Sequence, residues 1–262
     1  MDRLLQATAR AERDHFWFRG FRRFVTPQVV RAVGGRPGSA ILDCGCGTGH
    51  NLSMLRRYGR TVGIDLTWIG LAYARGRGER AVAQASAIQL PFADATFDLV
   101  TSFDMISALH DDDEAEALRE IYRVLRPGGH LVVNVAAMDI LTGNHSILAR
   151  EVRRYSRPGL RERLTKAGFA VRRLSYTNAS LLPIVAVVRL LQRLSGHRET
   201  EQEIAIPPRP VNAALSAALA IEASVLRLVN MPFGSSLMAL AQKPGTGFKP
   251  VAQPVRAAMR RG

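Results

Sequence analysis

One stretch constrains the fold more than any other part of the chain: residues 41–52, Ile-Leu-Asp-Cys-Gly-Cys-Gly-Thr-Gly-His-Asn-Leu. Ile41 and Leu42 end an apolar run that is typical of a buried parallel strand. Asp43 follows at the expected carboxyl end of that strand, glycines then alternate with other residues, and a helical pattern begins directly afterwards. A strand, a glycine turn and a helix in this order let a nucleotide-like ligand lie against bare backbone.

The spacing of the glycines narrows the choice of ligand. A turn that binds a pyrophosphate reads G-x-G-x-x-G, whereas this turn reads G-x-G-x-G and follows an acidic residue. A carboxylate beside the turn would repel a pyrophosphate but would suit a cationic ligand with an amino group. The stretch Asp43-x-Gly45-x-Gly47-x-Gly49 resembles motif I of the class I S-adenosylmethionine-dependent methyltransferases. The alternative is a strand-to-helix turn in an unrelated α/β protein.

Two further stretches carry the same resemblance. Residues 86–92, Ser-Ala-Ile-Gln-Leu-Pro-Phe, are similar to the family's Asp-Ala-x-x-Leu-Pro-Phe, with Ser86 in place of the Asp. Leu-Arg-Pro-Gly-Gly at residues 125–129 precedes an apolar strand, as it does in the family. The resemblance implies an α/β protein with the Rossmann-like class I methyltransferase fold. That fold has a seven-stranded, mostly parallel sheet, here with an N-terminal helical segment and a helical insertion between strands six and seven.

The apolar patterns predict where the elements lie. Strands are expected near residues 40–44, 60–66, 80–85, 96–103, 130–137, 168–178 and 236–243. Helices are expected near residues 2–33, 49–58, 67–77, 111–125, 156–167, 180–194 and 212–230. The predicted parts are an N-terminal helical cap (1–38), a cofactor-binding core (39–178), a helical insertion or lid (179–235), the last core strand (236–243) and a basic tail expected to be disordered (244–262).

The resemblance also implies which residues hold S-adenosylmethionine. The implied positions lie in the glycine turn and after the next three strands: Asp43, Gly45, Cys46, Gly47, Asp65, Leu66, Ser86, Ala87 and Phe103. Asp65 ends the second expected strand, where an acidic residue can accept hydrogen bonds from both ribose hydroxyls. The alternative role for Asp65 is to cap the following helix. Because the hydroxyl of Ser86 is short, adenine recognition is expected to rest on backbone groups near Ala87.

The two ends of the chain look like a narrower bacterial methyltransferase family, often encoded beside glycosyltransferase or natural-product genes. The likeness rests on His-Phe-Trp-Phe-Arg-Gly at residues 15–20 and on Arg-Arg-Tyr at residues 153–155. It also rests on Asn212, Glu222 and Pro-Phe-Gly-Ser-Ser-Leu at residues 232–237.

The departures from that family fall on the acceptor side of the site. The family has an Asp and a His where this chain has Ser146 and Glu151, and a Glu-His pair where it has Ser107 and Ala108. These differences predict that cofactor binding is retained while the acceptor has changed.

Candidate acceptor-side residues follow from the same segments. The candidate catalytic residues are Glu151, His145 and Tyr155, and the candidate substrate-binding residues are Trp17, Arg19, His110, Arg153 and Arg154. A carboxylate or an imidazole can remove a proton from a hydroxyl acceptor, and a guanidinium can hold an anionic group. For each, a plain surface or hydrogen-bonding role is the alternative. No metal ion is expected, because methyl transfer from a sulfonium needs none.

Charge points to the same kind of acceptor. The formal net charge is +14, and all but three of the 36 basic residues are arginine. This bias reflects either a GC-rich genome or an anionic partner, such as a phosphorylated substrate or a membrane surface. Nucleic acid is not expected, because no arginine block is interleaved with aromatic residues. Neither a signal peptide nor a transmembrane run is recognisable, so a cytoplasmic location with possible peripheral membrane contact is expected.

The sequence therefore predicts a methyltransferase that acts on an oxygen or carbon atom of a small hydrophobic acceptor. An isoprenoid or lipid-linked phosphorylated compound, in secondary metabolism or glycolipid biosynthesis, fits the apolar insertion together with the arginine-rich stretch 150–163. One alternative is a related protein that binds the cofactor but acts as a non-methylating cyclase or scaffold. A second alternative is a NAD-dependent oxidoreductase, against which the glycine spacing counts.

Overall fold

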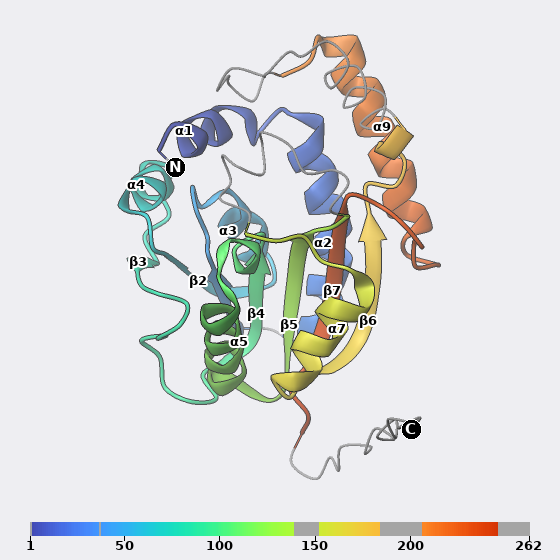
Figure 1. The fold of residues 1–262 in the computed structure, drawn as a ribbon. Helices are drawn as coiled ribbons and strands as arrows, with labels where there is room; N and C mark the ends of the chain where they lie inside the picture. Colours follow the sequence, from blue (N-terminus) through green and yellow to red (C-terminus); the bar gives the residue numbers. More distant parts are fainter. Residues whose placement is uncertain (1, 37, 139–151, 184–205, 246–262) are drawn as a thin grey trace, which may run out of the picture.

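A single twisted sheet organises the computed structural model, which describes residues 2–36, 38–138, 152–183 and 206–245. Its strands are β1 (Ser39–Cys44), β2 (Gly59–Asp65), β3 (Val82–Gln84), β4 (Phe97–Phe103), β5 (Leu125–Ala136), β6 (Ala170–Thr177) and β7 (Ser236–Gln242). The strand order is β3-β2-β1-β4-β5-β7-β6, and β7 runs antiparallel to both of its neighbours while the other pairs are parallel (Figure 1). The expected seven-stranded, mostly parallel sheet is confirmed.

Helices cover both faces of the sheet (Figure 1). The helices are α1 (Asp2–Ala11), α2 (Phe16–Val33), α3 (His50–Leu55), α4 (Trp68–Gly76), α5 (Asp111–Val124), α7 (Arg157–Lys166) and α9 (Arg209–Val225), with a short 3-10 turn, η1 (Ile106–Ala108). Helices α5 and α7 pack on one face, where Leu118, Ile121 and Leu160 join the core. Helices α2, α3 and α9 pack on the other, where Val29, Leu55 and Leu219 contact one apolar cluster. Apolar residues three and four positions apart give each helix the buried stripe that this packing needs.

The N-terminal segment is two helices, whereas one continuous helical stretch over 2–33 was expected. Helix α1 ends at Ala11, and α2 begins at Phe16 after His15, whose Nδ1 accepts a hydrogen bond from the backbone N–H of Trp17 at 3.2 Å. Side-chain capping of this kind satisfies an otherwise unpaired helix donor and fixes the new start. The break turns α1 toward α4 while α2 continues along the sheet (Figure 1).

Strand β5 begins earlier than the expected residue 130. Leu125 pairs with Phe97, the register then shifts, and pairing resumes with His130 opposite Leu99. The Arg-Pro-Gly-Gly stretch is therefore an irregularity inside the strand, in keeping with the tendency of Pro and Gly in strands to mark bulges.

The insertion leaves and re-enters the sheet at one edge. Thr177 at the end of β6 and Ala136 at the end of β5 both lie opposite Ser236, the first residue of β7. The chain thus leaves β6 and enters β7 at the carboxyl edge of the parallel strands, where α/β sheets bind ligands. Three predicted segments lie wholly or partly outside the described residues. They are the helix over 180–194 from residue 184, the polar linker over 197–210 as far as residue 205, and the tail from residue 246.

Helix α9 is held near its start by the N-terminal segment and near its end by the residues that follow β6. The Asn212 side chain accepts from the backbone N–H of Phe16 at 2.8 Å and donates to the carbonyl of Asp14 at 2.8 Å. The buried Glu222 carboxylate accepts from the backbone N–H groups of Ala179 and Ser180, each at 2.9 Å. The Asn212 bonds join α9 to the turn between α1 and α2, and the Glu222 bonds join it to the start of the insertion.

Helices α2 and α9 approach most closely at Gly20, and a substitution there has a defined expected outcome. A Cβ atom at Gly20 would lie 2.3 Å from Cδ1 and 2.9 Å from Cβ of Leu219. We expect Gly20→Ala to lower the free energy of unfolding by about 1–3 kcal/mol, as overpacking does. The loss shows as a melting temperature about 2–10 °C lower by circular dichroism.

The matched control is Gly76→Ala at the end of α4, where an added Cβ meets no atom within 4 Å. That variant should melt at or slightly above the parent temperature. In a Leu219→Ala background, Gly20→Ala should cause a smaller additional loss than it does in the parent. Equal melting of Gly20→Ala and the parent would contradict the close packing.

Candidate functional site

The glycine turn has a backbone conformation in which three glycines adopt left-handed φ values. Gly45, Gly47 and Gly49 have φ values of 85°, 50° and 76°, which side-chain-bearing residues adopt only with strain. The N–H groups of Gly45 and Cys46 both donate to the carbonyl of Ile64 at 2.8 Å, which joins the turn to β2. A Cβ at Gly45 would lie 2.6 Å from Cβ of Met105, whereas a Cβ at Gly47 would meet no atom within 4 Å. Gly47 is therefore the glycine whose backbone faces open space.

Asp43 lies beneath this turn as a buried and only half-satisfied carboxylate. It is 1% exposed, and its Oδ1 accepts from the Thr101 hydroxyl at 2.6 Å. Its Oδ2 has no hydrogen-bond partner among the described residues. Burial raises the pKa of Asp43 to about 7, with Thr101 opposing the rise and Asp65 adding to it. A buried acceptor atom without a partner is costly, so the site favours a donor, above all a cationic one.

Asp65 joins the glycine turn to the next turn of the fold. Its Oδ2 accepts from the N–H of Gly47 at 2.8 Å, and its Oδ1 accepts from the N–H of Thr67 at 2.8 Å and from the Thr67 hydroxyl. The residue before α4 is Thr67, so Asp65 is not itself the N-cap residue. Leu66 beside it is 67% exposed. The ribose contact stays a prediction, and the carboxylate already has a role in shaping the turn.

The remaining cofactor candidates lie at the same edge. Ser86 and Ala87 are half-buried after β3, and Ser86 bridges to Gln89. Phe103 ends β4, and its ring meets that of Phe21 edge-on with centroids 5.0 Å apart. The aromatic segment of α2 thus covers the carboxyl end of β4.

The Arg-Arg-Tyr segment is held inside the protein by α5. Tyr155 is 3% exposed, its OH donates to the carbonyl of Ile106 at 3.4 Å, and burial raises its pKa. The guanidinium of Arg153 pairs with Glu114 at 2.8 Å and with Asp111, and donates to the carbonyl of Leu109 at 3.0 Å. These contacts favour a positioning role for Tyr155 and Arg153.

The other acceptor-side candidates are dispersed. Arg154 donates to the carbonyl of Ala137 at 3.0 Å. Trp17 is half-buried against the apolar cluster that contains Val29 and Leu219. Arg19 and His110 are exposed. His145 and Glu151 lie outside the described residues. The structure thus brings the cofactor candidates together and leaves the choice of base a prediction.

Sequence reasoning missed Glu12, which connects the N-terminal helices to the glycine turn. Its buried carboxylate accepts from the Thr48 hydroxyl at 2.7 and 2.6 Å and pairs with Arg77 at 2.7 Å. Arg77 also donates to the carbonyl of Ala9 at 2.7 Å. A glutamate at the end of a helical pattern gives no local signal for a contact so distant in the sequence.

Comparisons with known proteins agree with this geometry. A methyltransferase domain matches residues 42–133. The O-methyltransferase resE of Aspergillus sclerotiorum is 32% identical over 183 residues, which are 61% of this chain and 67% of that protein. The chain spans between about half and two thirds of the length of the curated relatives that it matches first.

Solved structures share the whole architecture. The complex of the Haloferax volcanii Trm112 methyltransferase activator with a putative methyltransferase gives a TM-score of 0.60 at 20% identity, covering 93% of this chain and 96% of that one. The cyclase SpnF gives a TM-score of 0.54 at 24% identity, covering 85% and 82% of the two chains. A glycine turn flanked by two aspartates at the carboxyl edge of this sheet is the arrangement of the class I methyltransferases. The chain belongs to the S-adenosylmethionine-dependent methyltransferase family, and S-adenosylmethionine is its cofactor.

The residues of the glycine turn fit that cofactor. The partnerless Oδ2 of Asp43 suits the cationic amino group, and the open space over Gly47 admits a ligand against the backbone. No helix of the described residues is both long and apolar enough to cross a membrane.

The raised pKa of Asp43 predicts a pH-dependent stability in the absence of cofactor. The folded state keeps the Asp43 proton up to about pH 7, whereas the unfolded chain releases it at the lower, ordinary pKa of an aspartate. The contribution of this proton to the free energy of unfolding is therefore complete below the ordinary pKa and is lost as the pH rises through about 7. We expect the parent to lose about 1–3 kcal/mol relative to Asp43→Asn between about pH 5 and pH 7.

Urea unfolding of the two proteins across this range measures the difference, and all other titrating groups cancel in the comparison. Parallel pH profiles would mean that Asp43 ionises in the folded protein as it does in a peptide.

Proposed function

We propose that this protein transfers the methyl group of S-adenosylmethionine to an oxygen or carbon atom of a small hydrophobic acceptor. One observation carries the proposal: the aromatic segment of α2 covers the carboxyl edge beside the glycine turn, where Phe21 lies on Phe103. Similarity to an O-methyltransferase supports the reaction type. A role in secondary metabolism or glycolipid biosynthesis follows from the sequence features of both chain ends.

The proposed roles divide between two groups of residues. The cofactor is held by Asp43, Gly45, Cys46, Gly47, Asp65, Leu66, Ser86, Ala87 and Phe103. The bound cofactor supplies an activated methyl group on a sulfonium. The chain's own contribution is to exclude water and to align the acceptor, which can be worth roughly 7–11 kcal/mol of barrier. Glu151 or His145 is the proposed base for a hydroxyl acceptor, a step typically worth about 10²–10⁴-fold.

Tyr155 and Arg153 act in this proposal by positioning. The buried Glu114 holds Arg153, and the N–H of Tyr155 donates to the carbonyl of Ala136 at 2.8 Å at the end of β5. Together these bonds position residues 153–155, which follow Glu151 almost directly in the sequence. Trp17, Arg19, His110 and Arg154 remain proposed acceptor contacts.

The proposed acceptor is apolar and carries an anionic group, as an isoprenoid or lipid-linked phosphate does. Support comes from the apolar residues of the insertion, which begins where β6 ends at the carboxyl edge. The first of them, Leu181, is buried in the apolar cluster that contains Val29 and Leu219. The arginine-rich flank supports it less, because Arg153 and Arg163 both pair with Glu114 and Asp111. A cytoplasmic location with peripheral membrane contact completes this proposal.

A second candidate is a cofactor-binding protein that does not transfer methyl, such as a cyclase. Likeness to the cyclase SpnF favours it only through the shared fold. Incubation with radiolabelled S-adenosylmethionine and fractionated lysate separates the two. Label in an organic-extractable product is expected for the methyltransferase, and Gly47→Ala protein should form less of it at limiting donor concentration, in step with its weaker cofactor affinity.

The same assay also tests the base. Glu151→Gln and His145→Asn should bind the cofactor like the parent in calorimetry, and at least one of them should lose about 10²-fold in turnover of the labelled fraction. Cofactor binding without transfer to any fraction would favour the cyclase or scaffold. Loss of cofactor binding in both variants would remove these residues from the acceptor side.

A further inference from the structure

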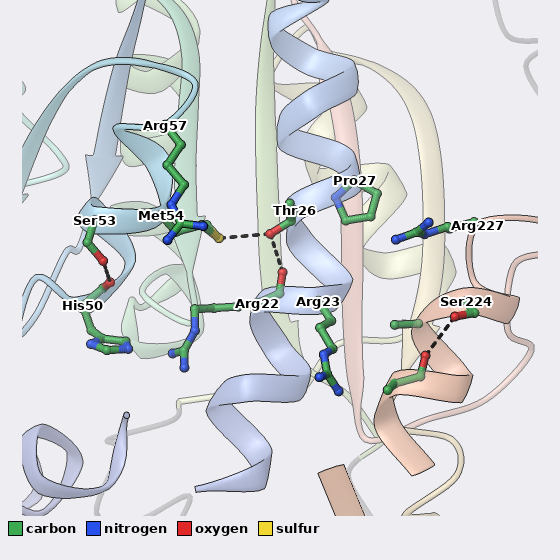
Figure 2. A pocket seen from close by; sticks show the side chains of 12 residues that line it. Arg22, Arg23, Thr26, Pro27, His50, Ser53, Met54, Arg57, Ser224 and Arg227 are labelled. Atoms are coloured by element: carbon green, nitrogen blue, oxygen red, sulfur yellow. Dashed lines mark hydrogen bonds between the residues drawn. The ribbon is translucent and has the colours of Figure 1, made fainter. Parts of the chain in front are cut away.

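A hollow of about 630 Å³ lies along α2, beside the helix that follows the glycine turn. On one side it is lined by His50 and Ser53 of α3 and by Arg57, which follows that helix (Figure 2). On the other side it is lined by Ser224 of α9 and by Arg227, which follows that helix (Figure 2). Helix α2 runs between them and contributes Arg22, Arg23, Thr26 and Pro27. Three elements that are distant in the sequence therefore meet around one concave surface.

The hollow is strongly basic. Arg22, Arg23, Arg57 and Arg227 line it, and no Asp or Glu is among its lining residues in the described part of the chain. Like charges gathered around one hollow repel each other. An arrangement of this kind becomes favourable when an anion occupies the space between them.

The side chains of Arg57 and Arg227 make no hydrogen bond within the described residues, and none of the four arginines has an ion-pair partner there. Other arginines of this chain do. Arg56, the neighbour of Arg57, pairs with the buried Glu79, and Arg123 pairs with Glu120 and Asp94. None of the four arginines of the hollow has a carboxylate paired with it in the described part of the chain.

The carboxylate that acts most on Arg22 is already engaged elsewhere. Glu12 attracts Arg22 but is hydrogen-bonded to Thr48 and paired with Arg77. Arg22 and Arg23 donate to the backbone carbonyls of Glu12 and Ser216, each at 3.0 Å, which positions the two guanidiniums. Burial and the charges of Arg22 and Arg77 lower the pKa of His50 to about 4, so its imidazole is neutral at pH 7.

The floor of the hollow is less polar than its rim. Thr26 donates to the carbonyl of Arg22 at 2.6 Å and contacts Sδ of Met54 at 3.1 Å, and Ser224 donates to the carbonyl of Ala220 at 3.1 Å (Figure 2). Because these hydroxyls are turned to their own helices, Pro27, Met54 and Ala223 leave a surface suited to the organic part of a ligand.

We infer that this hollow binds a phosphate-bearing ligand, with Arg57 and Arg227 as its free charged contacts. Guanidiniums bind phosphate through paired, charge-assisted hydrogen bonds. Four guanidiniums suit a multiply charged anion such as a phosphate better than the single negative charge of a carboxylate. The inference goes beyond the proposed methyl transfer and does not rest on it, since the binding can be measured without donor or acceptor. The phosphate can belong to a soluble compound or to a lipid headgroup.

The test uses two probes on the full chain: tripolyphosphate in calorimetry, and sedimentation with vesicles of phosphatidylglycerol against phosphatidylcholine. The variant Arg57→Gln with Arg227→Gln removes two charges from the hollow. The matched control, Arg80→Gln with Arg161→Gln, removes two charges from exposed positions outside it. Because both double variants have the same net charge, nonspecific attraction falls equally in both.

The parent is expected to bind at least one probe saturably. The hollow variant should bind that probe at least tenfold more weakly, with the control within twofold of the parent. Binding of tripolyphosphate alone identifies a soluble ligand, and binding of anionic vesicles identifies a headgroup. The inference is overturned if neither probe binds, if both double variants lose affinity equally, or if the parent prefers single-stranded RNA to both probes. Unchanged melting temperatures and unchanged affinity for S-adenosylmethionine verify that the variants are folded.

Discussion

Replacing Gly47 by alanine is expected to weaken the binding of S-adenosylmethionine by about 10- to 100-fold while the protein stays folded. The added Cβ would meet no protein atom within 4 Å, so its effect falls on the ligand that approaches this backbone. Isothermal titration with the cofactor gives the affinity, and thermal unfolding gives the stability.

The matched control for this variant is Gly78→Ala. Gly78 has a φ of 87°, and an added Cβ there is equally unobstructed, but it lies in the turn between α4 and β3. Both variants carry strain from the left-handed region, and only Gly47→Ala should lose cofactor affinity. Equal affinities in the two variants would remove Gly47 from the cofactor site.

Gly45 would make a poorer test, although the sequence alone favours it. The motif suggests that a side chain at Gly45 would enter the ligand space. The structure instead directs a Cβ at Gly45 into Met105, at 2.6 Å. Gly45→Val should therefore destabilise the protein first, and a loss of binding in that variant would not report on ligand contact.

Truncating Glu114 is expected to give the largest loss of stability, about 3–5 kcal/mol for Glu114→Ala. This carboxylate is fully buried and pairs with Arg153 and Arg163, each at 2.8 Å. Removing it leaves the two guanidiniums beside a buried space with only the exposed Asp111 as a charge partner. Urea unfolding followed by tryptophan fluorescence measures the loss.

Glu116 on the same helix supplies the comparison. It pairs with Arg119 on the surface, where such pairs contribute about 0–1 kcal/mol. Glu116→Ala should therefore unfold almost like the parent. If Glu114→Ala were equally stable, the Arg-Arg-Tyr segment would not depend on this ion pair for its position.

Much of the core could be predicted because its signals are local. The strand at residue 41, the glycines that follow and the acids at the strand ends each reflect a backbone or burial requirement within a few residues. The expected β1, β2 and β4 lie within one residue of the observed bounds. The same locality explains why the cofactor candidates gather at one edge.

The acceptor side could be predicted less well because its contacts connect distant parts of the chain. Asn212 meets residues 14 and 16, and Glu12 meets Thr48 and Arg77, and no periodicity encodes either contact. Arginines were expected to face the acceptor from residues 150–163. The buried Glu114, which reads in the sequence as part of an acidic helix start, engages two of them instead.

The place of β7 has a consequence for synthesis on the ribosome. This strand is the last of the seven to be made, yet it lies between β5 and β6 and is the single neighbour of β6 in the sheet. Until it emerges, β5 presents an unpaired apolar edge and β6 has nothing in the sheet to pair with. A nascent chain that stops before Ser236 can therefore form only the β3-β2-β1-β4-β5 part of the sheet. The N-terminal helices and α9 likewise contact each other only after nearly all of the described chain has been made.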